Sequence, residues 1–119
     1  MKRIESKIDT RSPEFEANRE VSEAVSRLAE AAHPSRIILF GSQARGNADD
    51  RSDYDFLVVC DAPYDRRRFV ASLLRSLNGV GIASDVVVLT PEEYETDKLI
   101  PGTIARPAWL EGKVLYESD

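Results

Sequence analysis

The segment IILFGSQARG at residues 37–46, followed by SDYDFLVV at residues 52–59, decides the fold. The first four residues are apolar and rich in β-branched side chains, and Pro34 and Gly41 bound them, as is typical of a buried strand. Gly41 permits a tight turn, and Ser42 can cap a short helical turn that follows it. Because the first amides of such a turn lack helical partners, they favour an anion. We therefore expect a small phosphate-binding turn after the first strand.

The second strand of this segment carries two carboxylates on one face. Asp53 and Asp55 are two residues apart, so their side chains leave an extended strand on the same side. Two like charges at this spacing repel each other unless a cation lies between them. Hard divalent cations prefer carboxylate and phosphate oxygens as ligands. The pattern therefore predicts a metal site beside the phosphate-binding turn.

Together the two motifs resemble the G-S-x-A-R-G…S-D-x-D-[LF]-x-V signature of the nucleotidyltransferase superfamily that includes DNA polymerase β. The short chain is similar to the minimal branch of that superfamily, the MNT (MntA-like) proteins, which are paired with HEPN-domain partners. The resemblance covers about residues 35–116, and it includes an E-G-x-x-[LV]-Y ending at residues 111–116. The alternative is a Gly-Ser turn followed by two solvated aspartates on an edge strand.

The resemblance implies a role for each motif residue. Asp53 and Asp55, with Asp85 as the third carboxylate on the neighbouring strand, would be catalytic and would hold the metal, two Mg²⁺ ions about 3.5–4 Å apart. Asp85 could also take a proton from the acceptor; its alternative is a strand-end aspartate that faces water. Gly41, Ser42 and Arg45 would bind the nucleotide, with ATP as the donor.

The assignment of Arg45 keeps a further alternative, and the single histidine is interpreted separately. Arg45 could neutralise a phosphate charge or instead form a salt bridge to Asp49 or Asp50. The single histidine, His33, is interpreted as a surface residue at a helix end, because no cysteine or second histidine lies near it.

The implied reaction is the transfer of a nucleoside monophosphate, AMP from ATP, to a hydroxyl group. Relatives that modify aminoglycosides or nucleic acid ends carry additional domains that hold the acceptor, and no part of this sequence matches one. We therefore expect a macromolecular acceptor, and the resemblance implies a HEPN-domain toxin for which this chain is the adenylylating antitoxin. The alternatives are a non-catalytic binding antitoxin and a small-molecule (aminoglycoside-type) nucleotidyltransferase.

Length, charge and cysteine content restrict the class of protein further. The 119 residues suit one domain, and no apolar run is long enough to span a bilayer. The net charge of −5 argues against a general nucleic-acid-binding surface, which needs dense Lys and Arg. A single cysteine, Cys60, excludes an internal disulfide and suits a reducing cytoplasm, and no secretion signal opens the chain. We expect a cytoplasmic protein.

The expected fold class is α/β (α+β): a nucleotidyltransferase fold with a mixed sheet of roughly four strands and helices packed mainly on one side. Residues 1–12 are expected to be a flexible N-terminal segment, and residues 13–119 a single minimal nucleotidyltransferase domain. Helices are expected from Ser12-Pro13-Glu14 up to Pro34, from Asp61-Ala62-Pro63 to Asn78-Gly79, and from a capping box at residues 90–93 to Pro101-Gly102.

Three further expectations concern packing. The helix before Pro34 should bury a stripe of Val21, Ala24, Val25, Leu28 and Ala32. The run of arginines at residues 66–68 is interpreted as a solvated helix face rather than a contact surface. Near the C-terminus, Ile104, Trp109 and Leu110 are expected to cover the sheet, with Trp109 buried.

Overall fold

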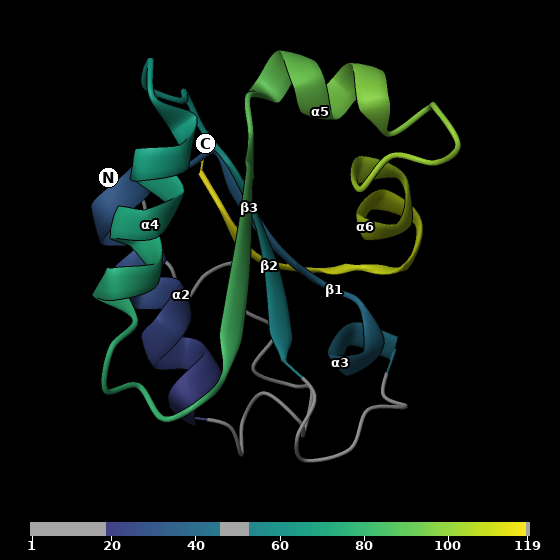
Figure 1. Cartoon of the computed structure of the whole chain (residues 1–119). Helices are drawn as coiled ribbons and strands as arrows, with labels where there is room; N and C mark the ends of the chain where they lie inside the picture. Colours follow the sequence, from purple (N-terminus) through teal and green to yellow (C-terminus); the bar gives the residue numbers. More distant parts are fainter. Residues whose placement is uncertain (1–18, 46–52, 119) are drawn as a thin grey trace.

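The computed structural model describes residues 19–45 and 53–118, and its helices and strands are shown in Figure 1. In chain order they are α2 (Arg19–Ala32), β1 (Arg36–Phe40), α3 (Ser42–Arg45), β2 (Tyr54–Val59), α4 (Arg66–Ser76), β3 (Ser84–Leu89), α5 (Pro91–Asp97), α6 (Ala105–Glu111) and β4 (Lys113–Glu117). The expectations for residues 1–12, for the helix start at Ser12 and for Asp49 and Asp50 lie outside the described residues.

The four strands form one mixed sheet in the order β3-β2-β1-β4. Strand β1 is antiparallel to both β2 and β4, whereas β2 and β3 are parallel. A parallel pair needs a crossover connection, and α4 supplies it between β2 and β3. The expected α/β fold with a small mixed sheet is confirmed.

The two longest helices of the described chain, α2 and α4, pack side by side on one face of the sheet (Figure 1). Val21, Ala24, Val25 and Leu28 of the predicted α2 stripe are buried and Ala32 is partly buried, while Ala29, which was not predicted, is also buried. From the sheet, Ile37, Leu39, Phe56 and Val58 point into this core, because alternate residues of a strand face the same side. This larger core matches the expectation that helices gather mainly on one side.

The opposite face of the sheet is covered in part by α5 and α6 (Figure 1). Its smaller core joins Ile38, Leu57 and Val59 of the sheet to three helical residues, Tyr94, Ala105 and Ala108. Gly112 ends α6 against β1: a Cβ there would lie 2.6 Å from Cγ2 of Ile38 and 3.0 Å from the Leu39 carbonyl oxygen. Because Gly112 has no side chain, α6 can approach the sheet through its two alanines.

Two expectations about helix boundaries need correction. Helix α4 begins at Arg66, with Asp65 as its N-cap accepting from the Arg68 N–H at 3.2 Å, rather than at Asp61-Ala62-Pro63. Helix α5 begins at the predicted capping box between Thr90 and Glu93, but it ends at Asp97.

The expected burial near the C-terminus is wrong. Ile104, Trp109 and Leu110 are 47%, 41% and 58% exposed, and Ala105 and Ala108 face the sheet in their place. Positions 105 and 108 are one helical turn apart, so they share a face, and Trp109 is turned to its flank.

Candidate active site

The strand register brings the two parts of the 37–59 segment together. Phe40 at the end of β1 pairs with Asp55 near the start of β2, and Asp55 pairs with Asp85 near the start of β3. Gly41 directly follows Phe40, so the turn and both carboxylates lie at one end of the sheet. Asp53 directly precedes β2 and is exposed. The expected meeting of the turn with the carboxylates of the second and third strands is present.

Asp55 lies directly against the backbone of Gly41. A Cβ placed on Gly41 would lie 2.5 Å from Oδ2 of Asp55. Gly41 also has a φ of +80°, a conformation that L side chains rarely adopt. This position therefore requires glycine for two separate reasons, a turn and a close approach. The sequence indicated the turn but not the close approach, which depends on the pairing of β1 with β2.

The three carboxylates act on each other electrostatically. The pKa of the Asp55 carboxyl is raised above its ordinary value, first by partial burial, then by the negative charges of Asp85 and Asp53. Asp85 is exposed, and its Oδ1 accepts a hydrogen bond of 3.0 Å from the Val86 N–H. Asp55 is thus the centre of a concentrated negative field, which a cation would relieve.

Helix α3 holds the other two candidate residues. Ser42 is its first residue and Arg45 its last, and the Gly41 carbonyl accepts from the Ala44 N–H at 3.1 Å. Ala44 is buried against the main core, which anchors this short helix beside Gly41.

The carboxylate oxygens at this site are ligands that suit a divalent cation, but the described residues do not form a complete coordination shell by themselves. In the ranges 19–45 and 53–118, no group of three or more His, Cys, Asp or Glu side chains is arranged to hold a metal ion by itself. Mg²⁺ commonly binds one or two carboxylates together with the phosphates of its substrate, so a complete protein cage is not required. Asp55 with its raised pKa and the neighbouring Asp85 and Asp53 provide oxygen ligands of that kind.

Two other residues singled out in the sequence lie apart from this site. Cys60 is buried at the opposite end of β2, and burial raises the pKa of its thiol to about 11, so it is a packing residue rather than a nucleophile. His33 is exposed just beyond α2, as expected. Within the described ranges, no helix has the length and apolar character needed to cross a membrane.

Comparison with known proteins shows the family to which this chain belongs. The family model of the nucleotidyltransferase domain matches residues 18–105. A protein of Methanocaldococcus jannaschii, named "Putative protein adenylyltransferase MJ0604", is 37% identical over 82 residues, which cover 68% of this chain and 77% of that protein. The chain therefore belongs to the nucleotidyltransferase domain family, and the expected resemblance is confirmed.

Two solved structures are also similar. One is a crystal structure of a "toxin-antitoxin with AMP-PNP", at 22% identity and a TM-score of 0.49, covering 81% of this chain and 73% of that one. The other is a mutant of the "toxin-antitoxin MntA-HpeT", at 20% identity and a TM-score of 0.49, covering 84% of this chain and 74% of that one.

Proposed function

We propose that this nucleotidyltransferase moves AMP from ATP to a hydroxyl group of a partner protein, with Asp53, Asp55 and Asp85 as its catalytic carboxylates. The observation that carries the proposal is the register that sets Asp55 beside Asp85 and against Gly41. This register places the negatively charged carboxylates next to a turn that is suited to binding phosphate. The name of the M. jannaschii relative supports a protein as the acceptor.

Each carboxylate has a distinct place in this proposal. Asp55 is partly buried and central, so it would hold the reacting phosphate group through Mg²⁺, with Asp53 beside it. Bound Mg²⁺, two ions by analogy with the superfamily, would stabilise negative charge on the α-phosphate and on the departing pyrophosphate. Asp85 is exposed and would take the proton from the attacking hydroxyl.

The bond changes are those of a single displacement. The hydroxyl oxygen of the acceptor bonds to the α-phosphorus of ATP, and the bond from that phosphorus to the oxygen bridging the α- and β-phosphates breaks. The electron pair leaves with pyrophosphate. Gly41, Ser42 and Arg45 would hold the outer phosphates so that the α-phosphorus faces the acceptor.

The charge of the chain and the motif resemblance bear on the class of acceptor. A net charge of −5 and a cluster of carboxylates oppose a polyanionic acceptor such as RNA. The motif resemblance supports a HEPN-domain toxin as the acceptor, for which the chain would be the antitoxin.

Intact-mass spectrometry of the acceptor tests this function. The chain is incubated with ATP, Mg²⁺ and the protein encoded by the adjacent gene, and the mass of one AMP is expected on that protein. A stable complex without added mass, which protects cells equally well when Asp53→Asn is introduced, would show a binding antitoxin instead. Transfer of label to a free aminoglycoside would show a small-molecule enzyme.

A further inference from the structure

Large apolar side chains gather around α6 and the connection from α5. Leu99 and Ile100 in this connection are 61% and 45% exposed, and Ile104, Trp109 and Leu110 of α6 and its N-cap are 47%, 41% and 58% exposed. We call these five residues the α5–α6 surface. Figure 1 shows α6 and this connection at the outer side of the molecule, away from α2 and α4.

Helix α6 has apolar side chains on its exposed side as well as on the face that packs against the sheet. Ala105 and Ala108 pack on the sheet, while Trp109 lies on one flank of the helix and Leu110 points away from the core. A surface helix ordinarily places polar residues opposite its buried stripe, whereas a helix that is apolar all round is ordinarily covered on all sides. Helix α6 also carries Arg106 and Glu111, but Leu110 opposite the buried alanines and Trp109 on the flank leave apolar side chains where polar ones are ordinary.

The exposed side chains are held in place. The Lys98 ammonium lies 5.2 Å from the centre of the Trp109 ring and 5.6 Å from the centre of the Tyr94 ring. The Thr103 hydroxyl donates to the Asp97 carbonyl oxygen at 2.6 Å. The Arg106 guanidinium donates to the Lys98 carbonyl oxygen at 3.2 Å, which ties α6 to the end of α5. An apolar surface fixed in this way would lose little conformational entropy on binding.

The α5–α6 surface lies on the same side of the sheet as the carboxylates. Asp55 shares its strand face with Leu57 and Val59, which pack against the helices of this side. A protein seated on α6 would therefore extend over the face that carries the active site. This relationship identifies an occupant, because the acceptor of the proposed reaction must lie over the same face.

We infer that the α5–α6 surface is the docking surface for the acceptor protein, which meets it with an apolar surface of its own and presents a hydroxyl side chain to Asp55 and Asp85. The inference rests on the proposed function. A second copy of this chain is a poorer occupant, because it brings an equal net charge of −5 against the first. A nucleic acid is a poorer occupant for the same reason of charge.

Binding of the co-expressed protein from the adjacent gene tests the inference. Trp109→Ala and Leu110→Asp are each expected to weaken the complex by about 30-fold or more, since buried aromatic and aliphatic anchors dominate interface energy. Tyr64→Ala is the matched control: Tyr64 is fully exposed but lies beyond the far end of β2, so affinity is expected to remain unchanged. Circular dichroism of each variant confirms that it folds.

The outcomes separate this inference from the proposed function. Loss of the complex with Trp109→Ala but not with Asp53→Asn supports the docking surface, whether or not AMP is transferred. AMP transfer at the wild-type rate by both Trp109→Ala and Leu110→Asp would overturn the surface while leaving the function intact. Wild-type chain that forms no complex, or that self-associates through Trp109 in sedimentation experiments, would also overturn it.

Discussion

The carboxylate of Asp55 fills the space that a side chain on Gly41 would need, with Oδ2 2.5 Å from the position of a Cβ there. This relationship links the turn after β1 to the acidic strand β2. It also means that the turn cannot change without displacing the central carboxylate of the proposed site.

Gly41→Ala is therefore expected to abolish nucleotidyl transfer, because the new methyl group pushes the Asp55 carboxylate away from Asp85. It should also cost about 1–2 kcal/mol of unfolding free energy from the positive φ. Gly79→Ala is the matched control, since Gly79 has a φ of +85° but nothing within 4 Å of a Cβ. That variant should lose similar stability and keep full transfer rates. Equal loss of activity in both variants would contradict the role of the close approach.

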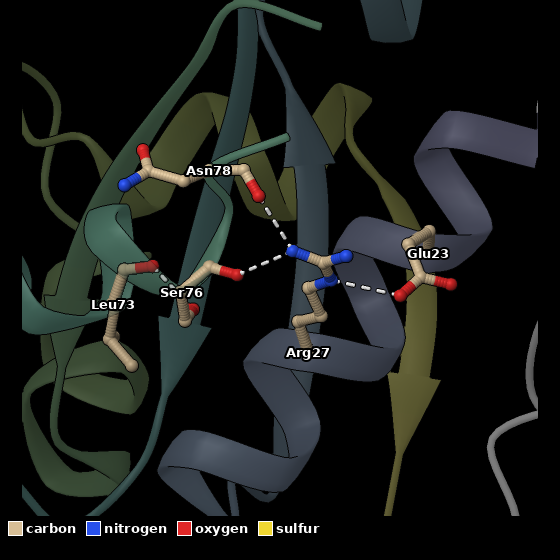
Figure 2. Close-up of polar contacts among 5 residues, drawn as sticks. All are labelled: Glu23, Arg27, Leu73, Ser76 and Asn78. Atoms are coloured by element: carbon tan, nitrogen blue, oxygen red, sulfur yellow. Dashed lines mark hydrogen bonds and ion pairs between the residues drawn. The ribbon is translucent and has the colours of Figure 1, made fainter. Parts of the chain in front are cut away.

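Arg27 joins α2 to the end of α4 (Figure 2). Its Nη1 donates to the carbonyl oxygens of Ser76 at 3.1 Å and Asn78 at 2.8 Å, and its Nε pairs with Glu23 at 2.9 Å. Arg27→Ala should lower the free energy of unfolding by about 1–2 kcal/mol, because hydrogen bonds from a charged donor to carbonyls are lost. Glu23→Gln removes only the exposed ion pair and should cost at most about 0.5 kcal/mol. Urea denaturation measures both; equal effects would show that the carbonyl contacts contribute nothing.

The Glu93 carboxylate makes a pH-dependent contribution to the free energy of unfolding of the domain. Its pKa is lowered, first by the Thr90 N–H, which donates at 2.9 Å, and then by the Arg66 guanidinium at 2.8 Å. The folded state thus favours the carboxylate, so its contribution is present above the unfolded pKa near 4.5 and is lost as pH falls through the lowered folded value.

Glu93→Gln should therefore lower the melting temperature at pH 7 and flatten the decline of melting temperature below about pH 4.5. Glu92→Gln, an exposed residue in the same turn of α5, controls for the loss of a charge near the helix N-terminus. If the melting temperatures of wild type and Glu93→Gln declined in parallel below about pH 4.5, this account would be contradicted.

Local patterns predicted most of the fold. The apolar runs gave β1, β2 and β3, and the capping box at Thr90 and Glu93 gave the start of α5, because these signals depend on near neighbours alone. The start of α4 was misplaced because both Asp61 and Asp65 can cap a helix, and sequence does not show which aspartate accepts the N–H.

The side-chain environment near the C-terminus could not be predicted in the same way. Apolar residues of α6 lie at 105, 108, 109 and 110, on more than one side of the helix, so periodicity does not indicate which of them faces the sheet. Gly112 decides the outcome, since it lets α6 approach so closely that only alanines fit beneath it. At the site, the residue types were visible in the motif, whereas the contact between Gly41 and Asp55 follows from strand register.

The most direct test of the central claim is label transfer from ATP labelled at the α-phosphate to the protein encoded by the adjacent gene, by wild type and by Asp55→Asn. The wild-type chain should transfer the α-label with Mg²⁺ and none from γ-labelled ATP. Asp55→Asn should lose about a hundredfold or more of the rate while keeping its melting temperature, because removing a like charge beside Asp85 and Asp53 costs the fold nothing. Asp61→Asn, an exposed acid at the other end of β2, should transfer normally. Wild-type rates of α-label transfer by Asp55→Asn would contradict the account.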